Sequence, residues 1–136
     1  MKARIASLLA TLLASCLTLA PAWLPAPAWA GPVNWQEVPA SAAGRQWWDA
    51  GSLRPTREGT VAVLSRFQPA GPDGDASRPL AADLYVMEID CGQRLYRDTS
   101  VNGIPRWRAE WQPGGADPLV DAVIQAACAA RQDLLS

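Results

Sequence analysis

Two cysteines, Cys91 and Cys128, follow an apolar N-terminal stretch that has the features of an export signal. An exported chain matures in an oxidising compartment, so the simplest expectation is one disulfide between them. The alternative is two buried free thiols, which behave as small apolar side chains. Because a bridge would tie together two distant segments, it constrains the fold more than any other feature of the sequence.

The export signal is expected at residues 1–30. A short basic start precedes an apolar run over residues 5–20, and Ala28-Trp29-Ala30 supplies a small-x-small cleavage site. The exported domain is then residues 31–136, located in the periplasm or at the cell surface, with no membrane insertion after cleavage. This length supports one modest core.

A second processing route is open at Cys16. Leu13-Ala14-Ser15-Cys16 has the shape of a lipoprotein cleavage box, and lipidation there would anchor the protein to a membrane. The chain stays apolar after Cys16, where a lipoprotein normally has a polar tether. This favours soluble export, with the lipoprotein as the alternative.

Each remaining cysteine lies on the apolar side of a predicted element. In the strand expected at residues 83–91, alternation places four side chains on one face: Tyr85, Met87, Ile89 and Cys91. Near the C-terminus, helical spacing groups Val120, Val123, Ile124, Ala127 and Cys128. That helix is expected to begin with Asp117 as N-cap and Pro118 as its first residue. A disulfide would pack the helix onto this face of the strand.

The other segments rich in β-formers indicate an α+β fold. Strands are expected at residues 33–38, 46–48, 60–67, 94–99 and 105–111. Strands in succession followed by one helix predict an antiparallel β-sheet of about five to six strands. One C-terminal helix packs on one face of this sheet and is disulfide-linked to it.

The composition excludes several classes of function. The chain has no histidine, and its only lysine is Lys2. This removes histidine-based catalysis and histidine metal sites, and it leaves no Schiff-base lysine in the exported part. No catalytic, cofactor-binding or metal-ligating residues are therefore expected, and the protein is predicted not to be an enzyme. An enzyme that uses only carboxylates and arginines is the least favoured hypothesis.

The charge balance argues against nucleic acid as a partner. Of the 12 basic residues, Lys2 and Arg4 lie in the predicted signal, which leaves ten arginines against 13 acidic residues. A mildly acidic domain with scattered arginines binds nucleic acids and anionic membranes poorly.

Two polar motifs are explained by turns and loops. Asp49 and Ser52 are expected to form a turn in which Asp49 caps backbone amides, because no base is available to activate the serine. The carboxylates of Asp73 and Asp75 lie in a Gly/Pro-rich loop over residues 69–80. Two carboxylates are few for Ca²⁺, so a solvated loop is expected.

A third polar motif is the pair Glu88 and Asp90, which share one face of the strand at 83–91. They could form a paired-carboxylate site, but a polar outer face is favoured. On that interpretation they meet Arg94 or Arg97 across a hairpin.

The tryptophans are the best candidates for binding. Trp47 and Trp48 are neighbours on a strand, so their rings point to opposite faces, and one helix covers only one face. One ring is then exposed, covered by a loop or used in an interface. Trp47 and Trp48 are therefore the predicted partner-binding residues. Trp107 and Trp111 share a face of the last predicted strand and are expected in the core under the helix.

The order of these motifs resembles a known family. Trp47-Trp48-Asp49-Ala50-Gly51-Ser52-Leu53-Arg54 is followed by a valine-rich strand and by Ile89-Asp90-Cys91 with Arg94 and Tyr96 beyond it. Trp111 beside Pro113-Gly114 and a short helix ending in Cys128 complete the pattern. The chain thus resembles the surface-adhesin protein E family of small exported bacterial proteins over most of residues 35–128. The resemblance implies an antiparallel sheet with a disulfide-tied C-terminal helix. It also implies adhesion, which the family is named for.

Two hypotheses for function follow. The first is an exported, non-catalytic interaction module, adhesin E-like and associated with the cell envelope or surface. Its partner is an unknown protein or a second copy of the same chain. The alternative is a periplasmic carrier that binds a small ligand in a tryptophan-lined cleft. Capture of a protein partner by crosslinking in the native envelope would favour the first, and quenching of tryptophan fluorescence by a metabolite would favour the second.

Overall fold

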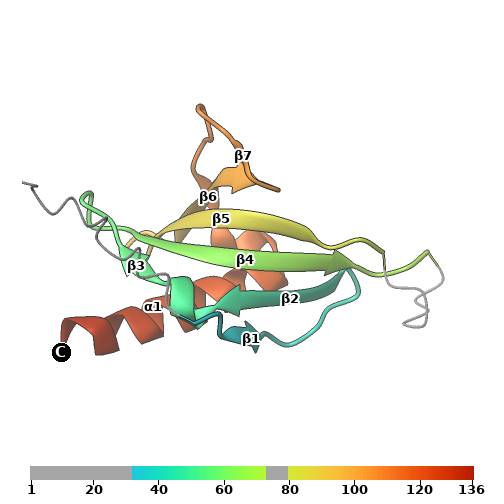
Figure 1. Ribbon diagram of the computed structural model, residues 1–136, viewed down its shortest axis with the longest axis horizontal. Helices are drawn as coiled ribbons and strands as arrows, with labels where there is room; N and C mark the ends of the chain where they lie inside the picture. Colours follow the sequence, from blue (N-terminus) through green and yellow to red (C-terminus); the bar gives the residue numbers. More distant parts are fainter. Residues whose placement is uncertain (1–31, 73–79) are drawn as a thin grey trace, which may run out of the picture.

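The computed structural model describes residues 32–72 and 80–136. The predicted signal at residues 1–30, Cys16 and the segment containing Asp73 and Asp75 lie outside the described residues. One antiparallel sheet with a helix across one of its faces makes up the described part (Figure 1). The fold class predicted from the sequence is therefore confirmed.

Within the described residues, the sheet has eight strands rather than five to six. Its four longest strands are β2 (Gly44–Asp49), β4 (Val61–Pro69), β5 (Asp83–Asp90) and β6 (Leu95–Val101). The short ones are β1 (Trp35–Glu37), β3 (Arg54–Pro55), β7 (Ile104–Pro105) and β8 (Gln112–Pro113). The order is β1-β2-β4-β5-β6-β7, with β3 on β4 and β8 on β6. Two-residue pairings carry too little periodicity to be counted from the sequence.

The strand predicted at residues 105–111 is wrong. β6 turns at Asn102 and Gly103, whose φ angles of 49° and 81° suit a two-residue hairpin turn. β7 then pairs with β6 only as far as Pro105, and pairing resumes at Gln112 in β8. Proline has no backbone N–H to continue a ladder. Residues 106–111 therefore leave the sheet, as the segment projecting beyond β7 in Figure 1.

Helix α1 (Pro118–Leu135) begins where the sequence predicts. The Asp117 carboxylate accepts hydrogen bonds from the amides of Leu119 at 2.8 Å and Val120 at 3.4 Å, which satisfies two N–H groups of the first turn. Two short 3₁₀ helices, η1 (Ala50–Ser52) and η2 (Gly114–Ala116), flank β2 and α1. Among the described residues, no helix combines the length and apolar character needed to cross a membrane.

The core lies between α1 and one face of the sheet. Its buried residues are Val38, Trp48, Val61, Val63, Met87, Ile89, Leu119, Val120, Val123, Ile124 and Ala127. The predicted apolar faces of strand and helix are both confirmed, because Met87 and Ile89 from β5 pack with Val123 and Ile124 from α1.

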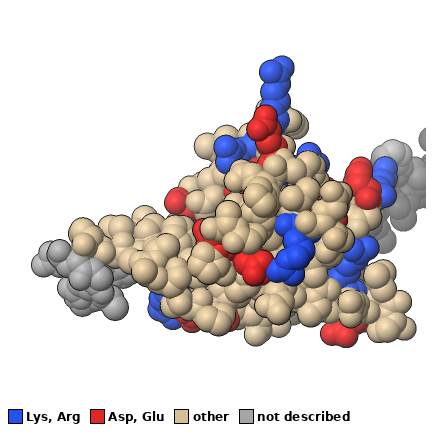
Figure 2. Space-filling view, turned by 180° about the vertical axis from the view of Figure 1, so that it is seen from behind, with Lys and Arg blue, Asp and Glu red and all other residues tan. Residues whose placement is uncertain are grey.

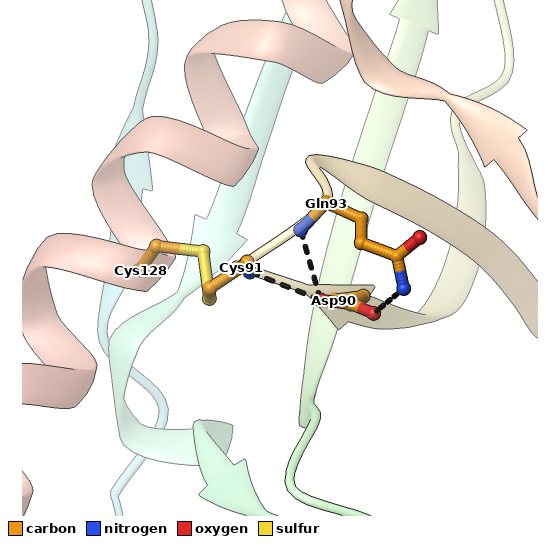
Figure 3. Close-up of a disulfide and its surroundings, with 5 residues drawn as sticks. Asp90, Cys91, Gln93 and Cys128 are labelled. Carbon is orange, nitrogen blue, oxygen red and sulfur yellow. Dashed lines mark hydrogen bonds between the residues drawn. A yellow bond between two sulfur atoms is a disulfide. The ribbon is translucent and has the colours of Figure 1, made fainter.

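The disulfide between Cys91 and Cys128 is present and joins the end of β5 to α1 (Figure 3). The turn after Cys91 is held by Asp90, whose carboxylate accepts hydrogen bonds from the amides of Gly92 at 2.9 Å and Gln93 at 3.1 Å. The side-chain amide of Gln93 donates to the same carboxylate at 3.0 Å. Asp90 therefore orients the turn that presents Cys91 to the helix.

Replacing both cysteines, Cys91→Ala with Cys128→Ala, should lower the free energy of unfolding by about 4 kcal/mol, because the bridge closes a long loop in the unfolded chain. The sequence separation of the two cysteines is 37 residues. Urea denaturation of the oxidised protein and the double variant measures this difference. Equal unfolding midpoints would contradict a stabilising role for the bridge.

Candidate functional site

The Trp47 and Trp48 rings point to opposite faces of the sheet, as predicted. Trp48 packs in the core beneath α1, and Trp47 lies on the face away from the helix. Neither ring is exposed, however: their exposed fractions are 8% and 7%. Of the three alternatives predicted for one ring of this pair, exposure to solvent is therefore wrong, because both residues are buried. Partner contact through Trp47 or Trp48 stays a prediction.

Two arginines lie over the Trp47 ring. The guanidinium carbon of Arg66 lies 4.2 Å from the centre of the Trp47 ring, and that of Arg45 lies 4.8 Å from it. Arg66 also reaches the Trp35 ring at 5.7 Å. The planar guanidinium group stacks favourably on aromatic faces. Arg66, Arg45, Trp35 and Trp47 form what we call the arginine layer.

Glu37 holds one end of the arginine layer in place. Its carboxylate accepts two hydrogen bonds from the Arg45 guanidinium, at 2.7 and 2.8 Å. The hydrogen bond from Arg45 lowers the pKa of Glu37. This bidentate contact fixes the orientation of the guanidinium above Trp47.

The same open face carries a second charged contact. Glu88 is buried, and its carboxylate accepts hydrogen bonds from the Thr60 hydroxyl at 2.7 Å and the Arg97 guanidinium at 2.8 Å. Arg97 in turn lies 4.5 Å from the centre of the Trp111 ring. The predicted pairing of this strand face with Arg97 is thus confirmed, while Arg94 pairs with Asp121 on α1. The Glu88 carboxylate is therefore engaged in contacts within the sheet surface.

Asp49 and Ser52 form a turn, as the sequence indicates. The Asp49 carboxylate accepts hydrogen bonds from the amides of Asn34 at 2.7 Å and Gly51 at 2.9 Å. The Ser52 hydroxyl donates to the Asp49 carbonyl at 2.8 Å and accepts from the Leu64 amide at 2.8 Å. Both side chains are therefore engaged with the backbone.

Among the described residues, Trp107 is the most exposed tryptophan. Its exposed fraction is 88%, and Trp111 is 37% exposed. The prediction that both lie in the core is wrong, because residues 106–111 leave the sheet and project from it. In Figure 2, this projection carries basic and acidic side chains close together. We call residues 104–111 the projecting segment.

The projecting segment is held at both ends. β7 and β8 pair with β6 at its start and just after its end. The amide of Arg106 donates to the Thr99 carbonyl at 2.9 Å, and the amide of Ala109 donates to the Arg106 carbonyl at 3.3 Å. These contacts position the segment on the edge of the sheet.

A small cleft lies beside the start of α1, on the helix side of the sheet. Its volume is about 200 Å³, and it is lined by Gln46, Phe67, Tyr85, Tyr96, Asp98 and Asp117 with Met87 and Val120. The rings in this lining belong to phenylalanine and tyrosine. The tryptophan-lined cleft expected of a carrier is therefore not what these residues form.

Asp98 is the unusual group of the cleft. Burial raises the pKa of its carboxyl above the ordinary value of 3.8, and Arg106 opposes part of this effect. Burial also raises the pKa of Tyr85 and Tyr96, and Asp98 is among the charges that add to it. Within residues 32–72 and 80–136, Asp98 forms no ion pair. Sequence patterning missed Asp98, because nothing in a lone aspartate on a strand marks it as buried.

The comparisons with known proteins decide the family. A family model described as the surface adhesin-E family matches residues 36–134. The chain belongs to the surface adhesin-E family. No curated protein and no solved structure matches it significantly.

Membership of the surface adhesin-E family indicates an adhesin-like role at the surface and contact with other molecules. The match begins at the second residue of β1 and extends into the last turn of α1, so it includes Cys91, Cys128 and the projecting segment. The resemblance stated from the motifs is confirmed.

The Asp98→Asn variant of this surface adhesin-E domain should be more stable than the parent at pH 7. A carboxyl whose pKa is raised on folding favours the folded state when protonated, and that contribution is lost as pH rises through the folded pKa. The gain should therefore shrink as pH falls toward 3.8.

Urea denaturation at several pH values measures this, with Asp133→Asn as the control, because Asp133 is exposed near the end of α1. A gain that is independent of pH would contradict the raised pKa.

Proposed function

We propose that the protein is an exported, non-catalytic interaction module that contacts a protein partner through the projecting segment. Residues 1–30 act as the export signal and residues 31–136 form the exported domain, in the periplasm or at the cell surface. Family membership supports the adhesin-like role. Trp107 is the central contact residue on this proposal.

The exposure of Trp107 is the observation that carries the proposal. A tryptophan that is 88% exposed leaves most of its apolar surface in water. Tryptophan and arginine are enriched among residues that dominate binding energy at interfaces. Arg106 and Arg108 flank Trp107 in the sequence, and Ile104 in the same segment is 70% exposed.

The fixed ends of the projecting segment support the same conclusion. A recognition residue on a segment held at both ends loses less conformational freedom on binding than one on a free loop. The two sheet faces are less suited to this role, because α1 covers one and the arginine layer covers part of the other. The charge distribution does not indicate another binding surface on the helix side, because basic and acidic groups are scattered there without a large patch of one sign (Figure 2).

The route to the surface follows from processing. Cleavage after Ala30 gives a soluble exported domain, and lipidation of Cys16 is the alternative that anchors the same domain to a membrane. The intact mass of the native protein distinguishes the two. Both routes leave the bridge between Cys91 and Cys128 unchanged, because Cys16 takes no part in it.

Site-specific crosslinking tests the role of Trp107. A photoreactive residue in place of Ile104 should give crosslinked adducts in the native envelope, and Trp107→Ala in that background should abolish them. The free energy of unfolding should change by no more than about 0.5 kcal/mol, because Trp107 is a surface residue. An adduct of twice the mass of the chain identifies a second copy as partner.

Leu134→Ala provides the matched control, because it removes another exposed apolar side chain, at the end of α1. This control should leave the adducts unchanged. Adducts that persist in Trp107→Ala, or that are lost equally in Leu134→Ala, would refute the proposal.

A further inference from the structure

A second binding site is formed by the cleft beside α1, apart from the projecting segment. We propose that this cleft binds a primary alkylammonium group, with the alkyl body against its rings and the ammonium at Asp98. The group comes either from a free amine or from a lysine side chain of another protein. The proposal is independent of the role of Trp107.

The lining of the cleft favours a cation. Two carboxylates, Asp98 and Asp117, border it, and none of the described residues that line it is basic. A half-buried carboxylate without an ion-pair partner is poorly solvated, and a bound cation restores the interaction it lacks. Arg106 acts on Asp98 only at longer range, because no ion pair within 4 Å joins them.

The rings favour an organic cation over a metal ion. Phe67, Tyr85 and Tyr96 line the same cleft, and aromatic faces attract cations. Among the described residues, no group of three or more His, Cys, Asp or Glu is arranged to hold a metal.

Hydrogen bonding favours a primary ammonium. Its three N–H donors need acceptors, and the Asp98 carboxylate is the acceptor best placed in the cleft. Gln46 also lines the cleft: its Nε2 donates to the buried Ser65 hydroxyl at 2.9 Å, so its amide oxygen is left as an acceptor, and the hydroxyl oxygens of Tyr85 and Tyr96 can accept as well. Asp117 is engaged as the cap of α1, so it contributes charge more than hydrogen bonds.

The volume limits the size of the ligand. At about 200 Å³ the cleft is below the range of pockets for drug-sized ligands, which begins at roughly 300 Å³. A short alkyl chain that ends in an ammonium fits this limit. Met87 and Val120 provide apolar surface for its methylene groups.

Calorimetric titration with two cationic probes tests the site, with a neutral probe for comparison. n-Butylammonium and Nα-acetyl-lysine N-methylamide should bind saturably, and n-pentanol should not. Asp98→Asn should weaken both cations at least about tenfold, as expected for loss of a charge-assisted contact. Asp133→Asn, which removes the same charge from the exposed end of α1, should leave them unchanged.

The two cations distinguish the source of the group. Tighter binding of the lysine derivative assigns the cleft to a lysine side chain, and tighter binding of n-butylammonium assigns it to a free amine. Three outcomes would overturn the proposal: no saturable binding of either cation, equal binding of n-pentanol, or unchanged affinity in Asp98→Asn with its circular dichroism spectrum preserved.

Discussion

A sheet has two faces, and a chain with one long helix can cover only one of them with a second layer. In this protein, the face without a helix is covered in part by the side chain of Arg66, which stacks on the Trp47 ring. Trp47 is only 8% exposed, and the guanidinium of Arg66 lies over its ring. Part of the guanidinium is also shielded from solvent: among the described residues, the buried Arg66 Nε has no hydrogen-bond partner. The contact with the ring faces takes the place of that hydrogen bond.

The way in which each face of the sheet is covered determines which surfaces remain for binding. On one face, α1 and the disulfide cover the core, and on the other, the arginine layer covers the β1–β2–β4 part. What remains is the edge beyond β6, where the projecting segment carries Trp107, and the cleft beside the start of α1. The two sites differ in chemistry: the first offers an exposed ring between arginines, and the second offers a carboxylate among rings. An adhesin-like domain of this size can therefore make contacts with its edge and with the cleft beside α1, while the covered parts of both faces serve stability.

The sequence predicts the elements whose periodicity is long and regular. The strand ending at Cys91 and the helix carrying Cys128 each place their cysteine on an apolar face, so the bridge, the core and the fold class follow. The cap at Asp117 and the turn at Asp49 also follow, because both depend on contacts between residues close in sequence.

The features that the sequence does not predict depend on long-range contacts. Trp47 is buried by Arg66, which lies 19 residues further along the chain and reaches it only through the register of β2 with β4. Trp107 alternates with charged residues as a buried strand would, yet Pro105 ends the pairing before it. The burial of Asp98 depends on where α1 begins relative to β6. Alternation alone distinguishes none of these cases.

A double-mutant cycle between Trp47 and Arg66 tests the central claim most directly, that arginine stacking closes the open face. Arg66→Met keeps the apolar stem and removes the guanidinium, and Trp47→Leu removes the ring. The free energies of unfolding of the parent, the two single variants and the double variant give the coupling between the two side chains. Stacking on a buried ring predicts a favourable coupling of about 1–2 kcal/mol. Strictly additive effects of the two substitutions on the free energy of unfolding would contradict the claim. They would mean that contacts of Trp47 with its apolar neighbours account for its burial.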